Sequence, residues 1–378
     1  MPIIAIVAGE ASGDLLGSHL ISALKAHRQD IQFFGIAGPK MQSAGAKTLY
    51  PMERLSVRGY VEVLKHLPGL LKLRRDLLKQ IIAAKPDLFI GVDAPDFNFW
   101  LEKKLKKAGI PTIHYVSPSI WAWRGGRMGG IKKAVSHMLA LFPFEPAIYQ
   151  RARVPVSFVG HPLADELPLE PNQKAAQKLL KIEKGKRVFA LLPGSRQSEV
   201  QQHSALLVKT AQLLSQKYEN ALFLVPLITR ETRNIFETER YKLAPEADNI
   251  QILFGHAHDA MEAADMVILA SGTATLEAAL LKRPMIITYK MPALSWQILK
   301  RMRYQPYVGL PNILAEKWLV PELLQKEATP EKLAEKCVEI LENQAGLEQL
   351  HDEYMQIHYS LKQDSAEKAA QVVLSYIK

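Results

Sequence analysis

The sequence contains very little cysteine and no long apolar stretch. Among its 378 residues there is one cysteine, Cys337, so the chain can form neither an internal disulfide nor a cysteine-based metal cluster. No segment approaches the roughly 18 apolar residues that a membrane-spanning helix needs. The first residues lack the basic leader and the small-residue cleavage site of a signal peptide. We therefore expect a protein of a reducing compartment that is neither secreted nor integral to a membrane.

Several common cofactor and catalytic motifs are also missing. The glycines after the first apolar run lack the G-x-G-x-x-G spacing, which disfavours NAD or FAD. The sequence has no Walker loop, no His-Glu-x-x-His zinc motif and no Gly-x-Ser-x-Gly elbow. We expect no cofactor and no resident metal.

The charge balance is moderately basic. Lys and Arg number 48 against 38 Asp and Glu, so the formal net charge is +10, and 48% of the residues are hydrophobic. This composition is typical of packed globular domains. The positive charge can serve solubility, or contact with nucleic acid, an anionic membrane or phosphorylated substrates. Because the basic residues are dispersed and no nucleic-acid module is present, we expect no nucleic acid partner.

Short apolar runs alternate with longer amphipathic stretches along most of the chain. Strands that are apolar on both faces and separated by helices are typical of parallel sheets covered on both sides. The sequence therefore predicts an α/β protein with two doubly wound sheets in series. The expected strands are 3–8, 31–37, 87–92, 112–116, 137–141 and 156–159, then 187–192, 221–225, 250–253, 266–269 and 285–288. The clearest expected helices are 14–27, 70–84, 97–108, 201–217 and 273–281.

A proline-containing acidic connector separates the two series. It lies between residues 161 and 186 and includes Pro162, Pro168 and Pro171. We expect domains at 1–165 and 166–345, with helices at 346–378 that pack back on the first domain or on a partner subunit. Past Pro330 we expect helices only. Two such domains facing each other across a cleft would bind ligands at the carboxyl ends of their sheets.

The first expected strand ends in a glycine-rich turn, Gly9-Glu10-Ala11-Ser12-Gly13-Asp14. Free N–H groups at the start of the next helix can hold an anion or hydroxyl groups. Equally, Ser12 or Asp14 can simply cap that helix. The residues alone leave both interpretations open.

An aspartate follows the third expected strand, where the sequence reads Asp93-Ala94-Pro95-Asp96. Asp96 is well placed to cap the next helix. Asp93, just beyond the carboxyl end of a buried strand, is then the candidate general base. Two carboxylates without a further cluster make a poor magnesium site.

The loop 117–127 combines two tryptophans, two arginines and two glycines, which suits a ligand that carries phosphate and is partly apolar. Trp121 and Trp123 can instead be packing residues. His114 lies inside the expected strand before this loop, and we interpret it as a buried structural histidine.

Two loops of the second domain predict a nucleotide diphosphate site. In the first, Gly194-Ser195-Arg196 stands between a strand and a helix, where amides, a hydroxyl and a guanidinium can bind phosphate oxygens. In the second, Ser271-Gly272-Thr273 opens a helix that carries Glu277, whose carboxylate can accept both ribose hydroxyls. Glu277 can also be an ordinary acidic residue of a first helical turn. Either motif alone is weak, but together they favour a nucleotide diphosphate.

The segment 57–82 is both apolar and basic. Its apolar surface is wider than a sheet-covering helix needs, and five Lys and Arg residues flank it. This pattern is typical of contact with a membrane surface, although an ordinary amphipathic helix has much the same pattern. The proposed insertion patch consists of Val61, Val63, Leu64, Leu67, Leu70 and Leu71.

Taken together and in this order, these motifs resemble the lipid A disaccharide synthase family over roughly residues 3 to 312. The segments that carry the resemblance are Val7-Ala8-Gly9-Glu10-Ala11-Ser12-Gly13-Asp14, Gly91-Val92-Asp93-Ala94-Pro95-Asp96-Phe97-Asn98, His114-Tyr115-Val116-Ser117-Pro118-Ser119, Leu192-Pro193-Gly194-Ser195-Arg196, Ser271-Gly272-Thr273-Ala274-Thr275-Leu276-Glu277 and Val308-Gly309-Leu310-Pro311-Asn312.

The resemblance implies a GT-B glycosyltransferase with two Rossmann-like domains. It would transfer the sugar of UDP-2,3-diacylglucosamine, with inversion, to 2,3-diacylglucosamine 1-phosphate. The products would be UDP and the β-1,6-linked disaccharide 1-phosphate precursor of lipid A in a Gram-negative bacterium. The resemblance also implies a cytoplasmic enzyme bound peripherally to the anionic surface of the inner membrane. Its last helices would complete the first domain or form a homodimer.

On this basis the site residues have expected roles. Asp93 is the expected general base, with Glu10 as the alternate. Ser195, Arg196 and the amides near Gly272 and Thr273 would stabilise the departing UDP in place of a divalent metal. Glu277 would hold the ribose, and Gln197 and Asn312 would complete the pocket.

Two other functions remain open on the residues. One is a GT-B enzyme that acts on an unacylated UDP-sugar, of the epimerase or peptidoglycan transferase type. The other, a basic nucleic-acid-binding protein, is disfavoured by the dispersed charge.

Overall fold

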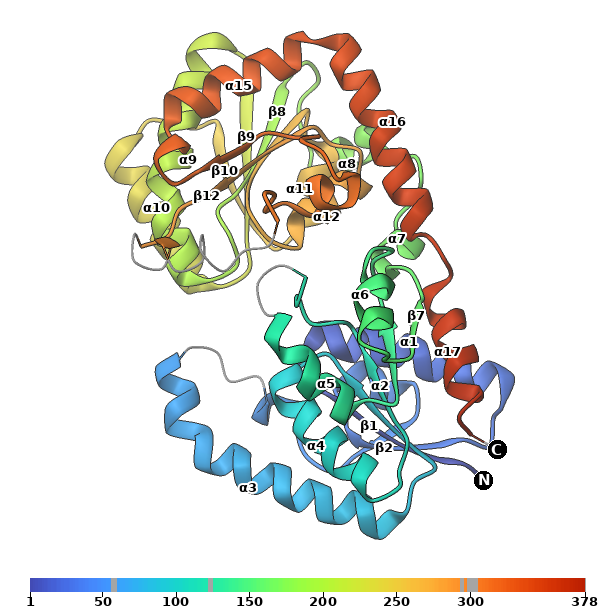
Figure 1. The fold of residues 1–378 in the computed structure, drawn as a ribbon. Coiled ribbons are helices and arrows are strands. Elements are labelled where there is room, and N and C mark those ends of the chain that lie inside the picture. Colours follow the sequence, from blue (N-terminus) through green and yellow to red (C-terminus); the bar gives the residue numbers. More distant parts are fainter. Residues whose placement is uncertain (56–59, 122–124, 293–295, 298–304, 378) are drawn as a thin grey trace. The chain divides into compact units, whose positions relative to one another are not determined.

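The chain forms two compact units in a computed structural model that describes residues 1–55, 60–121, 125–292, 296–297 and 305–377 (Figure 1). For residues 60–66 it describes the backbone alone. The first unit comprises Met1–Asp165 together with Leu361–Lys378, and the second comprises Glu166–Ser360. The expected boundary at residue 345 falls inside helix α16 (Gln344–Leu361), and the second unit continues to Ser360.

The first unit is built on a seven-stranded sheet with the order β3-β2-β1-β4-β5-β6-β7. Every pairing in it is parallel. Its strands are β1 (Ile3–Ala8), β2 (Gln32–Ile36), β3 (Ala46–Thr48), β4 (Leu88–Val92), β5 (Thr112–Tyr115), β6 (His137–Ala140) and β7 (Val156–Phe158). Because β1 pairs with both β2 and β4, the strand order reverses between β1 and β4. In open α/β sheets, ligands bind beyond the carboxyl ends of the strands at such a switch point.

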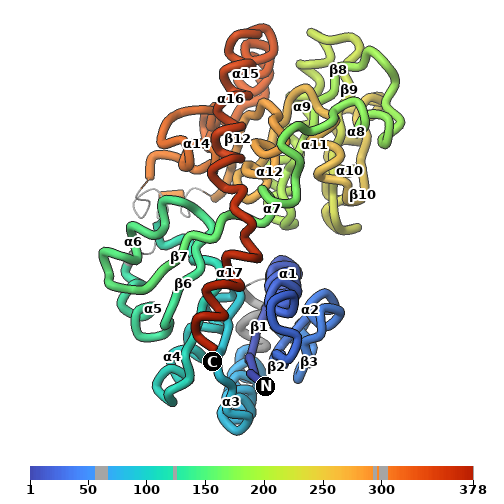
Figure 2. Tube along the Cα trace, turned by 90° about the vertical axis from the view of Figure 1, so that its right-hand side faces the viewer, coloured from blue at the N-terminus to red at the C-terminus, as the bar shows by residue number. Residues whose placement is uncertain are grey.

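Helices cover both faces of this sheet (Figure 2). The helices of this unit are α1 (Ala11–His27), α2 (Pro39–Ser43), α3 (Tyr60–Ala84), α4 (Pro95–Lys107), α5 (Met128–Ala134), α6 (Glu145–Arg151) and α17 (Ser365–Leu374). The short α7 (Pro162–Glu166) lies at the boundary, and its last residue belongs to the second unit. The carboxyl-terminal α17 packs against α1, and its Ala369, Ala370 and Val373 belong to the core of the first unit. The carboxylate of Asp165 accepts the backbone N–H of Gln363, Asp364 and Ser365, which ties the start of α17 to the end of the first domain.

The second unit repeats the plan with a six-stranded sheet, β10-β9-β8-β11-β12-β13, again all parallel. Its strands are β8 (Arg187–Leu192), β9 (Ala221–Leu227), β10 (Ile250–Phe254), β11 (Met266–Ala270), β12 (Met285–Tyr289) and β13 (Glu322–Leu324). Here the order reverses between β8 and β11. The expectation of two doubly wound parallel sheets is therefore confirmed.

The helices of the second unit form two layers. They are α8 (Gln173–Leu179), α9 (Gln197–Lys217), α10 (Arg230–Leu243), α11 (Ala257–Ala263), α12 (Ala274–Leu280), α14 (Leu310–Ala315), α15 (Pro330–Glu342) and α16. α9 packs with α10 and α15, whereas α11 packs with α8 and α12. The core between α9 and the sheet contains Phe189, Phe223 and Phe236, all fully buried.

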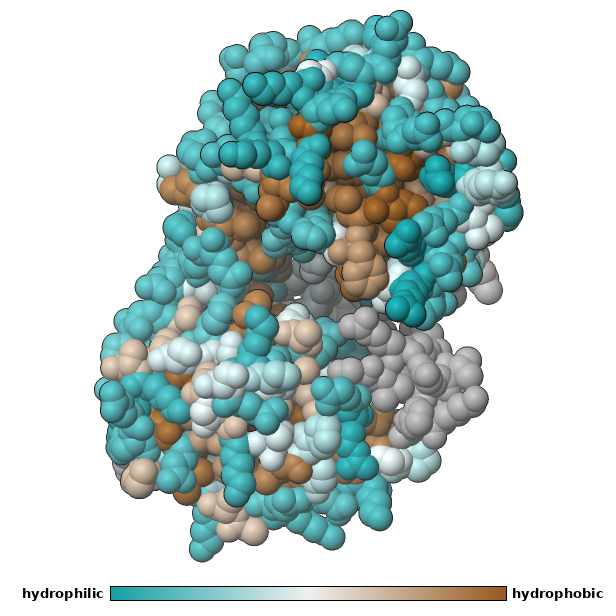
Figure 3. All heavy atoms as spheres, turned by 180° about the vertical axis from the view of Figure 1, so that it is seen from behind, coloured by the Kyte–Doolittle hydropathy of each residue, from teal (hydrophilic) through white to brown (hydrophobic). Residues whose placement is uncertain are grey.

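Two short edge strands were not predicted. β3 and β13 have three residues each, and each pairs with a single neighbour at the rim of its sheet. Segments this short show too little apolar alternation to stand out from a loop. The visible surface is mainly hydrophilic with scattered apolar patches (Figure 3), as expected when the apolar runs form internal sheets.

Candidate active site

The turn after β1 presents Glu10 and Ser12 to solvent at the switch point of the first sheet. α1 begins at Ala11, directly after Glu10, and the Ser12 hydroxyl donates to Oε1 of Glu10 at 3.1 Å. The buried Asp14 carboxylate accepts the backbone N–H of Lys40 and Met41, at the start of α2. The interpretation of Ser12 or Asp14 as the cap of α1 is therefore wrong, because Asp14 caps a different helix.

Asp93 follows β4 in an unusual backbone conformation. Asp93 and Ala94 both have left-handed φ angles, 49° and 44°, which cost energy in non-glycine residues and are common at functional sites. The turn is held by the Asp93 N–H, which donates to Tyr115 O at 2.8 Å. It is also held by the Asn98 amide, which donates to Asp93 O at 2.8 Å. These two hydrogen bonds fix the Asp93 backbone directly after the carboxyl end of β4.

The neighbouring Asp96 has a different role from the one expected. The cap position of α4 is Ala94, and Asp96 lies in the first turn. Its carboxylate is well exposed and pairs with Arg127 at 2.9 Å. The capping role predicted for Asp96 is wrong, and Asp96 instead ties α4 to the 3-10 turn Gly125–Arg127.

The environment of Asp93 favours its protonated form more than water does. Burial raises the pKa of Asp93, the nearby Glu10 carboxylate raises it further, and His114 lowers it. Glu10 and Asp93 are neighbours because Ala8 of β1 is in register with Val92 of β4. A carboxyl with a raised pKa beyond the carboxyl end of a central strand is a candidate general base.

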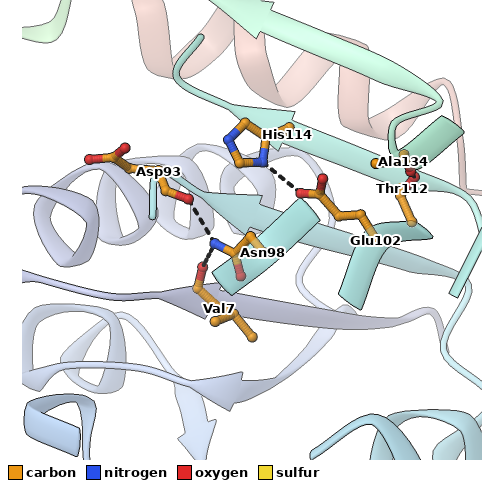
Figure 4. A network of polar contacts seen from close by, with 7 residues as sticks. All are labelled: Val7, Asp93, Asn98, Glu102, Thr112, His114 and Ala134. Atoms are coloured by element: carbon orange, nitrogen blue, oxygen red, sulfur yellow. Dashed lines mark hydrogen bonds and ion pairs between the residues drawn. The ribbon is translucent and has the colours of Figure 1, made fainter. Parts of the chain in front are cut away.

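A buried histidine–glutamate pair lies to one side of Asp93 (Figure 4). His114 of β5 and Glu102 of α4 are both fully buried, and Nδ1 of His114 lies 2.6 Å from Oε1 of Glu102. The expectation that His114 is buried is confirmed. Glu102 was not singled out, although it lies on the same face of its helix as Asn98 and Leu105, at spacings of four and three.

A second buried carboxyl, Glu145 at the start of α6, holds the turn after β6 and also contacts the loop after β5. Glu145 accepts the backbone N–H of Leu141 and Phe142, each at 3.0 Å. Burial raises the pKa of Glu145 from 4.5 to about 7. Hydrogen bonds to Glu145, including those from Ser117 and Trp121, lower the pKa but do not cancel this effect. Trp121 lies edge-on to Phe144 with 5.2 Å between ring centres. Trp123 and Arg124 of this loop lie outside the described residues.

In the second unit, the turn after β8 holds the expected phosphate-binding residues at its surface. Ser195, Arg196 and Gln197 are exposed at the start of α9. The carboxylate of Glu199 accepts the backbone N–H of Ser195 and Arg196 and pairs with the Arg196 guanidinium at 3.1 Å. These two amides therefore already have an acceptor, and the Arg196 side chain and Ser195 hydroxyl remain the groups that can reach an anion. Glu199 follows Arg196 at the three-residue spacing of a capping box, and this spacing is the feature of the sequence that indicates its role.

The turn after β11 brings a histidine to the expected ribose-binding carboxylate. Gly272 and Thr273 precede α12, and Glu277 lies within its first turn. His258 of α11 pairs with Glu277, with 2.9 Å between Nε2 and Oε2. Hydrogen bonding to Glu277 raises the pKa of His258 despite partial burial. His258 was not predicted, because it comes from a different element.

The buried side-chain amide of Asn312 is bonded within its own domain. Its amide donates to Val320 O and to Glu322, and its oxygen accepts the N–H of Leu319 and Val320. All four hydrogen-bonding positions of this buried amide are thus used within the protein. Asn312 orders its loop together with Glu322, which accepts the N–H of Val308 and Gly309.

The helix α3 turns one apolar face to the core and leaves other apolar residues accessible. Leu73, Leu77 and Ile81 are buried in the first unit, whereas Leu67 is 40% exposed and Leu70 and Leu71 are half-buried. Leu71 and Leu78 line a shallow groove together with Pro68, Lys72, Arg75, Asp76 and Lys79. The side chains of Val61, Val63 and Leu64 lie outside the described residues. No helix among the described residues is long and apolar enough to cross a membrane.

The candidate residues thus gather at the two switch points. Glu10 and Asp93 follow β1 and β4, the two strands between which the order of the first sheet reverses. Ser195 and Arg196 follow β8, and Gly272, Thr273 and Glu277 follow β11, the corresponding strands of the second. Among the residues that the structure describes, no group of three or more metal-ligating side chains is found.

Comparison with known sequences identifies the family. Residues 4–376 match the family model described as Lipid-A-disaccharide synthetase. The chain belongs to this family. It is 63% identical to the lipid-A-disaccharide synthase of Methylobacillus flagellatus, with all of both chains covered. It is 56% identical to that of Azoarcus sp. (strain BH72), over all of this chain and 96% of the relative.

Solved structures with the same fold include enzymes of other activities. The glycotransferase of kitacinnamycin matches with a TM-score of 0.65 at 14% identity over the whole of both chains. The UDP-GlcNAc 2-epimerase from Neisseria meningitidis matches with a TM-score of 0.63 at 12% identity over 99% of each chain. The expected GT-B fold is therefore confirmed for this member of the lipid-A-disaccharide synthetase family.

Proposed function

We propose that the protein joins two acylated glucosamine units into the lipid A disaccharide. The donor is UDP-2,3-diacylglucosamine, the acceptor is 2,3-diacylglucosamine 1-phosphate, and the product is the β-1,6-linked disaccharide 1-phosphate with release of UDP. The observation that carries this proposal is the family match over residues 4–376. The two clusters of polar side chains at the switch points of the sheets supply groups suited to the chemistry.

The second unit supplies the groups for the nucleotide. Glu277, half-buried and already in contact with His258, is suited to accept ribose hydroxyls. The guanidinium of Arg196 is 77% exposed and can pair with diphosphate oxygens, assisted by the Ser195 hydroxyl, by Gln197 and by the amides near Gly272 and Thr273. A fixed cation at the leaving diphosphate stabilises the charge that develops there, as a metal ion does in other transferases.

The first unit supplies the base. In an inverting transfer, the acceptor 6-hydroxyl oxygen forms a bond to the anomeric carbon as the bond from that carbon to the phosphate oxygen breaks. The electron pair of that bond leaves with UDP, and the hydroxyl proton passes to a base. Asp93 is the proposed base, with a pKa raised by burial and by Glu10, and Glu10 is the alternate. Both carboxylates lie at the switch point of the first sheet.

We also propose that α3 holds the protein on the membrane surface in which both acylated substrates reside. Accessible Leu67, Leu70 and Leu71 stand beside Lys72, Arg75 and Lys79. Apolar side chains flanked by basic ones suit an anionic bilayer surface, since leucines enter the acyl region while the cations meet headgroups. The net charge of +10 favours the same surface.

The test is the reaction itself. Purified protein is incubated with UDP-2,3-diacylglucosamine and 2,3-diacylglucosamine 1-phosphate in detergent micelles, with and without EDTA, and disaccharide and UDP are measured. We expect equal amounts of both products and no effect of EDTA. A parallel incubation with unacylated UDP-N-acetylglucosamine tests the alternative. Turnover of that sugar without turnover of the acylated pair would overturn the proposal in favour of an epimerase or peptidoglycan transferase type of activity.

A further inference from the structure

The ion pair of Glu102 and His114 is completely enclosed. Both side chains have no exposed surface, and the distance of 2.6 Å between Oε1 and Nδ1 is short for a hydrogen bond. Burying a carboxylate is costly unless a partner compensates its charge. Burial accordingly raises the pKa of Glu102, while the charge and hydrogen bond of His114 lower it. The mechanism proposed above gives this pair no role.

A glycine in β4 leaves room for the Glu102 carboxylate of this pair. Gly91 of β4 is in register with His114 of β5, and a Cβ at Gly91 would lie 2.3 Å from Oε1 of Glu102. The Glu102 carboxylate therefore lies against the backbone of β4 at Gly91, where there is no side chain. On the same helix, Phe99 packs against the His114 ring with 4.4 Å between ring centres. The ring is held both by a hydrogen bond and by packing.

The other ring nitrogen of His114 is the informative atom. Within the part of the chain that the structure describes, Nε2 is buried and has no hydrogen-bond partner, and the same holds for Oε2 of Glu102 and Oδ1 of Asn98. In Figure 4 the free ring nitrogen points to the side of the network on which the Asp93 carboxylate lies. His114 is also near enough to Asp93 for its charge to act on that carboxyl.

We propose that His114 is a positioning residue for the reaction: Glu102 keeps it positively charged, and its Nε2–H side holds the Asp93 carboxyl in the ionised form that can accept the hydroxyl proton. This inference rests on the proposed function, because it assumes that Asp93 is the base. Asn98 assists by fixing the Asp93 backbone through its amide. Glu102 and His114 together are close to electrically neutral, which makes their burial tolerable.

The groups that face Asp93 act in opposite directions. Glu10, from the turn after β1, disfavours the Asp93 anion, as does burial. His114, from β5, favours it, and Glu102, from α4, faces His114. Loss of the His114 charge removes the larger of the two influences that lower the Asp93 pKa and leaves the Ala94 backbone hydrogen bond against burial and Glu10. The base would then be protonated at pH values at which it is ionised in the natural protein.

The experiment compares the pH dependence of kcat/KM for the natural protein and for His114→Asn. The asparagine amide can still donate to Glu102, but it carries no charge. We expect the acidic limb of the profile to move to higher pH, with a loss of about tenfold at its acidic end. The rate at high pH should approach that of the natural protein, and the KM for the UDP-sugar should not change. An equal loss at every pH, with the limb unmoved, would overturn the proposal and leave His114 a structural residue.

Two controls separate the possible failures. His358→Asn removes another fully buried imidazole, in α16 of the second unit, and should leave the limb where it is. Asp93→Asn tests the base itself, and full activity of that variant would reject the proposed role of Asp93. If Asp93→Asn is inactive but the acidic limb of His114→Asn has not moved, only the present inference is rejected. ¹⁵N NMR of the histidine rings gives an answer even where His114→Asn does not fold. We expect both nitrogens of His114 to be protonated at neutral pH, and a neutral ring would overturn the proposal.

Discussion

Gly9 lies directly against Ala94. A Cβ at Gly9 would be 2.8 Å from the Cβ of Ala94, which is closer than two carbon atoms can approach without displacement. The turn after β1 can thus rest on the turn after β4 only because residue 9 has no side chain. This contact keeps Glu10 within electrostatic range of Asp93.

The first prediction concerns the pH dependence of the rate. Asp93 must be ionised to act as a base, and burial and Glu10 both raise its pKa, so the rate falls as the pH drops through that raised value. Asp93→Asn should lower kcat by about 10²–10⁴-fold. Glu10→Gln removes a like charge and should move the acidic limb to lower pH, as measured by kcat/KM in detergent micelles. A Glu10→Gln enzyme without activity would make Glu10 the base instead.

The second prediction concerns the leaving diphosphate. Arg196→Ala should raise the barrier by about 2–4 kcal/mol, the scale of a lost anion donor, with a smaller effect on folding. Arg233 is a matched control, because it is an exposed arginine paired with a glutamate of its own helix, Glu237, at 2.8 Å. Arg233→Ala should leave the rate unchanged. Equal rates for the two alanine variants would remove Arg196 from the site.

The sequence predicted the fold well because parallel sheets leave a strong pattern. Strands buried on both faces read as continuous apolar runs, and the helices between them show amphipathic spacing. The carboxyl ends of those runs also placed Asp93 and Arg196 next to strands at the switch points. The pattern does not show which residue each polar side chain bonds to. Asp14 caps a helix that begins 25 residues later, and His258 reaches Glu277 from another helix.

The bonds of the Asn312 side chain could not be read from the sequence either. Its four hydrogen-bonding positions are filled by residues 319, 320 and 322, none of which stands in the motif that contains Asn312. That Asn312 completes the nucleotide pocket stays a prediction.

The third prediction concerns competition at the ribose site. His258 holds Glu277 in the unliganded protein, and that hydrogen bond raises the pKa of His258. Binding of the UDP ribose to Glu277 must break the hydrogen bond between Glu277 and His258. Without that bond the neutral imidazole is favoured, so binding releases a proton. We expect affinity for UDP to fall as the pH drops through the raised pKa, as measured by calorimetry in buffers of different ionisation enthalpy. His258→Ala should abolish this proton release, and Glu277→Gln should weaken binding at every pH.

The fourth prediction concerns stability. In the folded protein the pKa of Glu145 is raised from 4.5 to about 7 by burial. The folded state therefore binds a proton that the unfolded state has lost, and stability falls as the pH rises from 4.5 to about 7. Over that range the loss is about 3 kcal/mol, and it then levels off. Glu145→Gln should remove this slope in urea unfolding followed at several pH values. An unchanged slope would show that Glu145 is ionised in the folded state.

The last prediction concerns the membrane. Leu67, Leu70 and Leu71 are accessible on α3, while Leu73, Leu77 and Ile81 of the same helix are buried. Replacing the first three with serine should release the protein from vesicles of anionic lipid without lowering the unfolding midpoint, because those side chains add little to the core. Leu179→Ser is the control, since Leu179 is 63% exposed on α8 of the second unit, and it should leave vesicle binding intact. If the triple variant still sedimented with vesicles, the accessible leucines would have no part in membrane contact. A fall in the unfolding midpoint would show instead that they are part of the core, because burial of each leucine contributes about 1.5–3 kcal/mol.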